Sequence, residues 1–226
     1  MAEHLVFKRI ASPQPVADYI YNVLARHLTA GRSVVWLVAG GSAMDVAVLV
    51  AKQLSTLDNL AKLTVTLTDE RWGEPGHQDS NWRQLGEKGF KLSGAQLAPV
   101  LTGKNLAQSA ADYGQFLTTA IKHSDYSLAL AGMGPDGHIF GILPNSPASA
   151  SDQPVIGYKW TDYARLTPTI SLLKQLDEVV VYATGEPKWP QIDKLKDSIP
   201  AAQQPAQLLK QLPKVIFFND HRGEIG

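Results

Sequence analysis

A carboxylate and an imidazole, Asp136 and His138, stand two residues apart in a glycine-rich turn that follows the apolar segment 126–131. The ordinary pKa of histidine suits proton transfer near neutral pH, so His138 could act as a general base. Gly134 and Gly137 would allow the backbone of the turn to approach a ligand closely. A histidine after such a turn can also have a purely structural role. The pair by itself therefore leaves catalysis open.

A second candidate site is the turn Gly40-Gly41-Ser42, which follows the apolar run 33–39. Glycines between a strand and a helix let backbone N–H groups face an anion, and the Ser42 hydroxyl adds a donor. The turn could bind a phosphate, or it could be a tight turn in which Ser42 caps the next helix. It does not continue into the glycine patterns of dinucleotide or Walker-type sites, so nucleotide binding there is unsupported.

A third candidate cluster contains Asp69 and Arg71, directly after the β-branched segment 63–68, and Asn81 further along. A guanidinium at a strand end could hold a carboxylate, or could stabilise the oxyanion that develops on an attacked carbonyl. The alternative is a solvated cluster of surface ion pairs, which contribute little to stability. We favour the surface alternative for His77, because its neighbours are all polar.

Two further cations, Arg165 and Lys188, stand beside predicted strands. Together with a nearby anion-binding turn, they could clamp a phosphate group. Taken singly, each is better explained as an ordinary surface charge.

The segments that must position these residues alternate between short apolar runs and amphipathic helices. This alternation favours an α/β fold with three α/β/α layers, in which helices cover both faces of a mostly parallel, Rossmann-like sheet. The predicted strands are residues 33–39, 63–68, 126–131, 178–183 and 214–218, with weaker candidates at 155–157 and 164–167. The predicted helices are about 16–28, 43–54, 106–121 (with Asn105 as N-cap and Gln108 at N3) and 190–195. We expect a polar loop over 69–81, and we expect 214–218 to close the sheet.

Three of the predicted strands lead directly into candidate turns. The carboxyl ends of parallel strands lie on one edge of a sheet, so we expect these turns to converge on one pocket. No linker, repeat or low-complexity tract interrupts the chain, and we expect residues 1–226 to form a single domain.

The composition narrows the class of protein. The chain has 226 residues, with 21 Lys plus Arg and 21 Asp plus Glu, so its formal net charge of zero favours neither nucleic acid nor an anionic membrane. Cysteine is absent, which excludes disulfides, thiolate nucleophiles and cysteine-ligated metals. We see no signal peptide and no apolar run near the ~18 residues of a spanning helix, and expect a soluble, cytoplasmic protein.

The remaining residue types suggest no cofactor. The six histidines lack the spacing of metal ligands, and the aromatic residues, 8% of the chain, are not interleaved with basic ones. We therefore expect no metal, no cofactor, no nucleic-acid partner and no membrane partner.

In their order along the chain, these motifs resemble those of the 6-phosphogluconolactonase family, which belongs to a larger group with the glucosamine-6-phosphate deaminases. The resemblance spans about residues 7–220. It rests on Gly40-Gly41-Ser42, Asp69-Glu70-Arg71 with Asp79-Ser80-Asn81, the run from Gly132 to His138, Arg165-Leu166-Thr167, and Gly185-Glu186-Pro187-Lys188. The run Gly-Met-Gly-Pro-Asp-Gly-His is the most specific of these motifs.

The resemblance implies hydrolysis of 6-phospho-D-glucono-1,5-lactone to 6-phospho-D-gluconate, a step of the pentose phosphate pathway, without a metal. His138 would be the general base that activates water, and Arg71 would stabilise the oxyanion. Asp136 could orient the imidazole, although a two-residue spacing does not guarantee contact. The substrate and its phosphate would be bound by Gly40, Gly41, Ser42, Gly134, Arg165 and Lys188, and sugar hydroxyls or Arg71 would be positioned by Asp69 and Asn81. We expect a monomer or a weak homodimer.

Two departures from the family pattern concern substrate identity. Ala43-Met44 stands where the family usually has Thr or Ser and then Pro, and Ile139 to Leu143 replaces the usual Thr-Ala-Ser-Leu-Phe. Ile139 after Asp-Gly-His is deaminase-like. Two alternatives therefore stay open: a deaminase or isomerase of an amino sugar phosphate that uses the same aspartate and histidine, and a non-catalytic sugar-phosphate sensor.

Overall fold

Seven parallel strands form the central sheet of the structure, a computed structural model that describes residues 4–223. The order across the sheet is β1-β10-β9-β6-β2-β3-β5, and each neighbouring pair runs parallel. The strands are β1 (Leu5–Arg9), β2 (Val34–Val38), β3 (Leu63–Leu67), β5 (Gln96–Leu97), β6 (Tyr126–Gly132), β9 (Glu178–Ala183) and β10 (Val215–Asn219). The prediction of a mostly parallel α/β sheet is confirmed.

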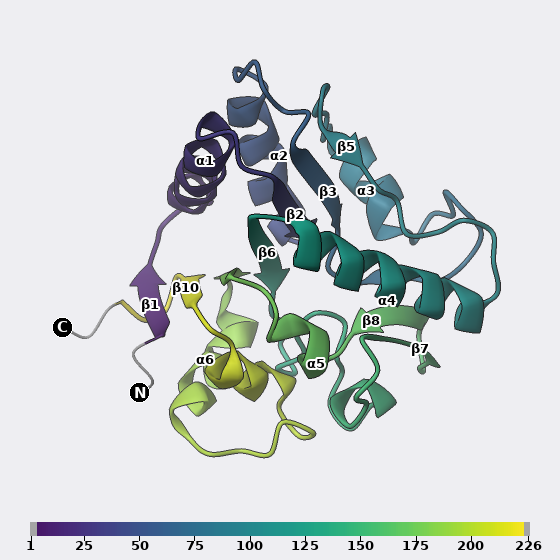
Figure 1. The fold of residues 1–226 in the computed structure, drawn as a ribbon. Helices are drawn as coiled ribbons and strands as arrows, with labels where there is room; N and C mark the ends of the chain where they lie inside the picture. Colours follow the sequence, from purple (N-terminus) through teal and green to yellow (C-terminus); the bar gives the residue numbers. More distant parts are fainter. Residues whose placement is uncertain (1–3, 224–226) are drawn as a thin grey trace.

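Helices cover the sheet on both faces. Helices α1 (Gln14–Thr29) and α2 (Ala43–Leu54) pack side by side on one face, and α4 (Leu106–His123) lies across the other (Figure 1). Every residue of β2 and β9 is buried, which explains why these strands are unbroken apolar runs rather than alternating ones. The three helices lie close to their predicted bounds.

Helix α4 begins where the sequence predicts. Asn105 Oδ1 accepts a hydrogen bond from the backbone N–H of Gln108 at 2.9 Å, so Asn105 is the N-cap. Gln108 Oε1 accepts a hydrogen bond from Asn105 Nδ2 at 2.9 Å. Gln108 therefore returns a bond to the side chain of the capping residue, a variation on the usual capping box.

The chain reverses its direction across the sheet between the neighbours β2 and β6. From β2 it proceeds to β3 and β5 at one edge, whereas from β6 it proceeds to β9 and β10 toward the other edge. In open α/β sheets, a crevice for ligands opens at the carboxyl ends of two such strands. The turn Gly40-Gly41-Ser42 follows β2 and the turn 133–138 follows β6, so both lie at this crevice.

A second, antiparallel sheet begins just after β3. Its order is β4-β8-β7, and its strands are β4 (Glu70–Arg71), β7 (Val155–Lys159) and β8 (Ala164–Pro168). It packs beside α4 (Figure 1). The two weaker strand candidates are thus strands, but they belong to this separate sheet.

Several predictions about segments are wrong. The expected loop 69–81 contains β4 and the start of helix α3 (Asn81–Glu87). Strand β10 does not close the sheet, because β1, which was not predicted, lies outside it. The expected helix at 190–195 is divided into α6 (Trp189–Asp193) and a 3-10 turn. The remaining short elements are α5 (Ile170–Leu173) and the 3-10 segments Pro147–Ser149, Glu186–Lys188, Lys194–Lys196 and Pro205–Gln211.

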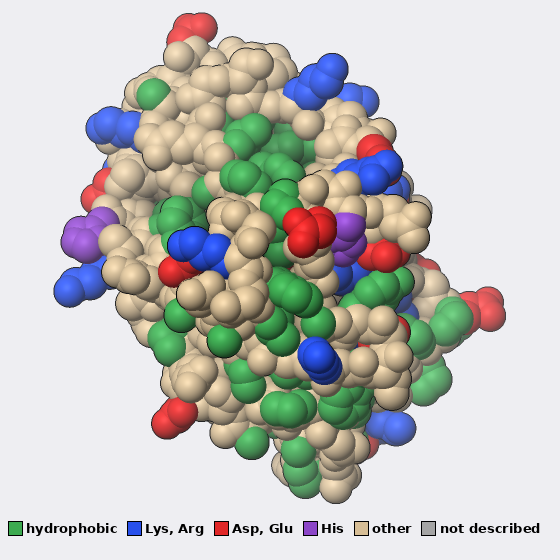
Figure 2. Space-filling model, turned by 90° about the vertical axis from the view of Figure 1, so that its right-hand side faces the viewer, with side chains coloured by type: hydrophobic (Ala, Val, Ile, Leu, Met, Phe, Trp, Pro, Cys, Tyr) green, Lys and Arg blue, Asp and Glu red, His purple; other side chains and the backbone are tan. Residues whose placement is uncertain are grey.

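The surface and the helices agree with the balanced composition. Within residues 4–223, no helix is both long and apolar enough to cross a bilayer. On the face drawn in Figure 2, acidic and basic side chains are interspersed, and neither sign dominates.

Candidate active site

A cavity of about 340 Å³ opens at the carboxyl ends of the strands. All the predicted site residues except Asp136 line it: Gly40, Gly41, Ser42, Asp69, Arg71, Asn81, Gly134, His138, Arg165 and Lys188. They come from segments that follow β2, β3, β6 and β9 and from β8, so the structure brings together the turns that topology places on one edge. The cavity is also lined by residues that the sequence did not single out, among them Phe140, Gly141, Asp162 and Tyr163.

Asp136 contacts the one candidate base in the cavity. His138 Nδ1 lies 2.7 Å from Asp136 Oδ1, which also accepts a hydrogen bond from the backbone N–H of His138 at 3.1 Å. Partial burial favours a higher pKa for Asp136, but the hydrogen bond and charge of His138 outweigh it and hold the pKa below its ordinary value. An ionised carboxylate can only accept, so in the neutral imidazole Nδ1 carries the proton and Nε2 keeps a free lone pair.

Glycine is required in the turn that holds this pair. A Cβ atom at Gly134 would lie 2.2 Å from the ring of His138, and Gly137 has a φ of +83°. The backbone N–H of Gly134 donates to the carbonyl of His138 at 3.0 Å, which closes the turn around the imidazole. Gly132, Gly134 and Gly137 also match the spacing Gly-x-Gly-x-x-Gly. The turn leads into isolated β-bridges rather than a helix, so the dinucleotide-binding context is missing.

The turn after β2 is open toward the cavity. Gly41 has a φ of +66°, in the left-handed region that favours glycine. Ser42 has helical backbone angles and its side chain makes no capping hydrogen bond. Its hydroxyl oxygen instead lies 3.5 Å from Lys188 Nζ. The simple capping alternative for Ser42 is therefore wrong, and the hydroxyl is available to the cavity.

Lys188 is a partly buried cation beside that turn. It ends the 3-10 segment Glu186–Lys188, which follows β9. Burial lowers its pKa, while the charge of Asp220 opposes the decrease. Among residues 4–223 no carboxylate forms a salt bridge with it. Lys188 is thus free of a direct carboxylate contact in the part of the chain that the structure describes, as suits an anion site.

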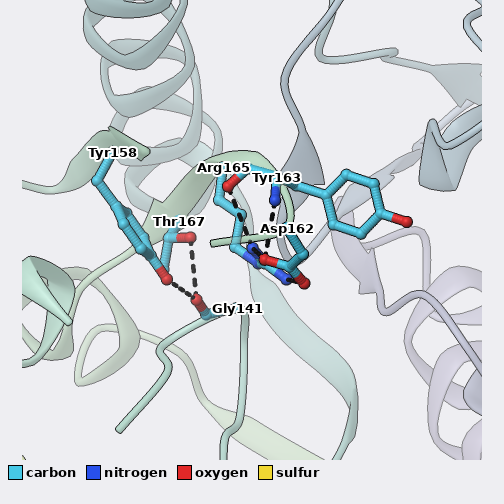
Figure 3. Close-up of polar contacts among 6 residues, drawn as sticks. All are labelled: Gly141, Tyr158, Asp162, Tyr163, Arg165 and Thr167. Atoms are coloured by element: carbon cyan, nitrogen blue, oxygen red, sulfur yellow. Dashed lines mark hydrogen bonds and ion pairs between the residues drawn. The ribbon is translucent and has the colours of Figure 1, made fainter. Parts of the chain in front are cut away.

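Arg165 is already paired. Its Nη1 and Nη2 atoms donate to the two carboxylate oxygens of Asp162 at 2.7 and 2.8 Å (Figure 3). The guanidinium holds the pKa of Asp162 far below its ordinary range. The side chain of Arg165 is 11% exposed and that of Asp162 is 49% exposed. A phosphate at Arg165 would share the guanidinium with this carboxylate.

Arg71 differs from Arg165 in its partners. Its Nη1 donates to the carbonyl of Asp79 at 3.1 Å, and its guanidinium lies 4.7 Å from the ring centroid of Tyr163. No salt bridge to Arg71 is formed within residues 4–223. The alternative of a surface ion-pair cluster therefore does not describe Arg71 there.

Glu70 anchors the strand end that carries Arg71. Its carboxylate is fully buried and accepts hydrogen bonds from the backbone N–H groups of Arg71, Asn81 and Trp82, at 2.7, 2.7 and 3.1 Å, and from Ser80 Oγ at 2.9 Å. Burial raises the pKa of Glu70, and the hydrogen bonds oppose that rise. The carboxylate thus joins β4 to the first turn of α3, an interaction that spacing alone did not indicate.

Asp69 and Asn81 line the cavity beside this strand end. Desolvation raises the pKa of Asp69, against the hydrogen bond from Thr68 and the positive charges nearby. Asn81 Nδ2 donates to the carbonyl of Asp69 at 3.0 Å. Asn81 Oδ1 is buried and has no hydrogen-bond partner among the described residues. A Cβ at Gly40 would lie 2.4 Å from that oxygen, so this glycine gives the amide its space.

The departures from the family pattern fall in different places. Ala43, Met44 and Ile139 are fully buried and do not line the cavity. Phe140 and Gly141 do line it, with φ angles of +55° and +74°. Figure 3 shows the Gly141 carbonyl accepting from Tyr158 Oη at 2.5 Å and from Thr167 Oγ1 at 3.4 Å. The wall of the cavity therefore changes at Phe140 and Gly141.

His138 is the one histidine of residues 4–223 that lines the cavity, whereas His27 and His77 lie outside it. His77 Nε2 is 2.9 Å from the carbonyl oxygen of Arg71, and its partly buried side chain does not line the cavity. His27 is 6% exposed and stacks on Tyr126, with 3.9 Å between ring centroids. No group of three or more His, Asp or Glu side chains within residues 4–223 is arranged to hold a metal ion.

Known proteins resemble this chain in sequence and in fold. The chain is 27% identical to the 6-phosphogluconolactonase of Helicobacter pylori, over 74% of this chain and 77% of that protein, and 26% identical to the probable 6-phosphogluconolactonase 1 of Arabidopsis thaliana, over 82% and 76%. The fold matches the crystal structure of a 6-phosphogluconolactonase from Shewanella baltica with a TM-score of 0.80 and 21% identity, covering 97% of this chain and 99% of that one. The structure of the Trypanosoma brucei 6-phosphogluconolactonase matches with a TM-score of 0.72 and 21% identity, over 95% of each chain.

A family model extends over nearly the whole sheet. Residues 10–217 match the family described as glucosamine-6-phosphate isomerases/6-phosphogluconolactonase. The match includes every residue that lines the cavity. The chain belongs to this family.

Proposed function

We propose that the chain hydrolyses 6-phospho-D-glucono-1,5-lactone to 6-phospho-D-gluconate, a reaction of the pentose phosphate pathway. The observation that carries the proposal is that His138, held by Asp136, lies in the same cavity as Arg71 and Lys188. Within residues 4–223, neither of these two cations forms a salt bridge with a carboxylate. A neutral imidazole can activate water, and separate cations can serve a carbonyl oxygen and a phosphate.

The reaction then follows from the positions of the protons. Nε2 of His138 takes a proton from water as the water oxygen bonds to the lactone carbonyl carbon. Arg71 stabilises the negative charge on the carbonyl oxygen, and Asp136 stabilises the imidazolium. When the bond between the carbonyl carbon and the ring oxygen breaks, the imidazolium returns its proton to that oxygen. The products are a carboxylic acid, which ionises, and a hydroxyl.

The phosphate is assigned to the side of the cavity near Lys188. The ammonium, the Ser42 hydroxyl and the backbone N–H groups of Gly40 and Gly41 supply donors there. Arg165 would contribute the donors that Asp162 does not use.

The opposite side of the cavity is assigned to the sugar. Asp69 and Asn81 would face the sugar hydroxyls, and Gly134 would bring its backbone close to the lactone. Fixing the phosphate in this way would place the carbonyl beside the base.

A parallel assay with two substrates tests the proposal. The purified protein is mixed with freshly generated phosphogluconolactone, with correction for spontaneous opening, and separately with glucosamine 6-phosphate. We expect faster lactone hydrolysis and no release of ammonia. His138→Ala should lose about 10²–10⁴-fold in kcat, the usual contribution of a general base.

Other outcomes would replace the proposed function. Ammonia release would favour the deaminase. Stabilisation of the fold by 6-phosphogluconate without acceleration of lactone opening would favour a sensor. The deaminase-like Ile139 gives no direct support to the first alternative, because its side chain is buried behind the cavity wall.

We also propose that the enzyme works in the cytoplasm as a monomer or weak homodimer, without a cofactor, nucleic acid or membrane. The lining segments are drawn from residues 39 to 188 and from both sheets, which supports a single domain over residues 1–226.

A further inference from the structure

We propose that Tyr163 is a positioning residue whose ring holds the Arg71 guanidinium at the oxyanion. This role rests on the proposed function, in which Arg71 stabilises the charge on the carbonyl oxygen. Tyr163 lies in the turn between β7 and β8 and lines the cavity.

Two positive charges face each other across the small antiparallel sheet. Arg71 of β4 and Arg165 of β8 are directly opposite in the register. Side chains at such positions lie on the same face within a few ångströms, and like charges there repel. Both guanidinium groups therefore need partners that hold them in place.

Arg165 obtains a carboxylate partner from the hairpin. Asp162 binds it with two hydrogen bonds of 2.7 and 2.8 Å, and the Tyr163 carbonyl accepts a third at 3.3 Å (Figure 3). These bonds fix the guanidinium and balance its charge. Arg165 is consequently anchored without the Tyr163 ring, whose centroid is 5.4 Å away.

Arg71 obtains an aromatic ring instead. Its guanidinium lies 4.7 Å from the centroid of Tyr163 and has one hydrogen bond from the side chain to protein, to the Asp79 carbonyl, among the described residues. The face of an aromatic ring attracts a cation without neutralising it. Arg71 can thus be held in place while its full charge remains available to the oxyanion.

The hairpin presents the ring in a defined position. The backbone N–H of Tyr163 donates to Asp162 Oδ1 at 2.8 Å, and its carbonyl accepts from the backbone N–H of Trp160 at 3.0 Å. In Figure 3 the ring extends away from Tyr158 and Thr167, whereas the Asp162 carboxylate faces Arg165. One short turn thus serves the two arginines in different ways.

The consequence for catalysis falls on kcat. In Tyr163→Leu the ring is absent, and misplacement of Arg71 should lower kcat by about 10- to 100-fold. KM should change by less than about threefold, because Lys188 and the Arg165–Asp162 pair remain. Tyr163→Phe keeps the ring face and should restore kcat to within about threefold of the original protein. Tyr21→Leu, the same change on helix α1 outside the cavity, controls for the loss of a tyrosine.

A double variant separates positioning from a general disturbance of the site. If Tyr163 acts through Arg71, adding Tyr163→Leu to Arg71→Ala should lower kcat by less than about twofold further. Unchanged kcat in Tyr163→Leu would overturn the proposal. So would an increase in KM alone, an equal loss in Tyr163→Phe, or additive losses in the double variant.

A spectroscopic measurement decides the contact without any substrate. The ring current of Tyr163 should shift the Nε–Hε resonance of Arg71, identified by its loss in Arg71→Lys. We expect the shift to persist in Tyr163→Phe and to disappear in Tyr163→Leu. An identical resonance in all three proteins would overturn the positioning role, whereas failure of the original protein to open the lactone would overturn the proposed function alone.

Discussion

Replacing Asp136 with asparagine tests the contact that fixes the tautomer of His138. The two groups are 2.7 Å apart, and their side chains are 47% and 37% exposed. A hydrogen bond to a charged group contributes about 1.5–3 kcal/mol, and solvent screening at this exposure reduces the value to about 1–2 kcal/mol. At about 1.4 kcal/mol per factor of ten, loss of the charge alone lowers kcat by about 5- to 30-fold.

Asparagine adds a second effect in the same direction. Its amide nitrogen can donate to Nδ1, which would leave the proton on Nε2 and remove the lone pair that accepts from water. We therefore expect a decrease in kcat of about 10- to 100-fold, smaller than that of His138→Ala, which removes the base itself. KM should remain close to its original value, since neither residue is assigned to the phosphate.

The assay is the initial rate of lactone opening, corrected for the uncatalysed rate. Asp58→Asn, an exposed aspartate outside the cavity, is the matched control. Because the pKa of Asp136 lies below its ordinary value of about 4, its carboxylate is ionised throughout pH 5–8. The carboxylate should thus act on His138 throughout that window, and the original protein should exceed Asp136→Asn in kcat at each pH within it. Unchanged kcat at pH 7 in a folded Asp136→Asn protein would refute the role of the carboxylate.

Two further predictions concern Lys188 in the cavity and His27 in the core. Lys188→Ala should raise KM by about tenfold or more with little change in kcat, since a charge-assisted contact contributes about 1.5–3 kcal/mol. Lys91→Ala is the control. An unchanged KM in Lys188→Ala would show that Lys188 does not bind the phosphate. Burial lowers the pKa of His27 in the folded protein, so as the pH falls His27 is protonated in the unfolded chain first. The free energy of unfolding should therefore decrease as the pH falls below about 6.5, by at most about 1.4 kcal/mol per pH unit. The free energy of unfolding in urea, measured between pH 7.5 and 5, should depend less on pH in His27→Phe, which keeps the stack on Tyr126. The control His123→Gln should keep the original pH dependence. Equal pH dependence in all three proteins would show that another group causes it.

The central sheet could be predicted because its strands are unbroken apolar segments. Strands β2, β6 and β9 are buried on both faces, and no other element explains such short continuous runs. The glycine-rich turns after β2 and β6 indicated where the cavity lies, because a crevice forms at the strand ends where the strand order reverses. Strand β1 escaped prediction: it is a five-residue edge strand that ends in Lys8 and Arg9.

The parts of the site that escaped prediction depend on contacts between distant segments. Strand β4 has only two residues, too few for any periodicity, and is fixed by the buried Glu70 and its pairing with β8. The spacing of Asp162 and Arg165 permits an ion pair. Only the structure of the hairpin, however, shows that the Asp162 carboxylate is hydrogen-bonded to Arg165, which was predicted to bind phosphate. The position of Tyr163 over Arg71 joins a turn residue to a residue of strand β4, and no local pattern encodes it.

The pairing of β1 with β10 has a consequence for the order of assembly. Within residues 4–223, β1 has no neighbour in the sheet other than β10, so β1 has no strand to pair with until β10, far along the chain, has been synthesised. A nascent chain that lacks β10 would expose an unsatisfied edge on β9 as well as a free β1, and both are templates for mispairing. Pairing of β1 is thus delayed until β10 is available, and it joins two strands that are far apart in the sequence.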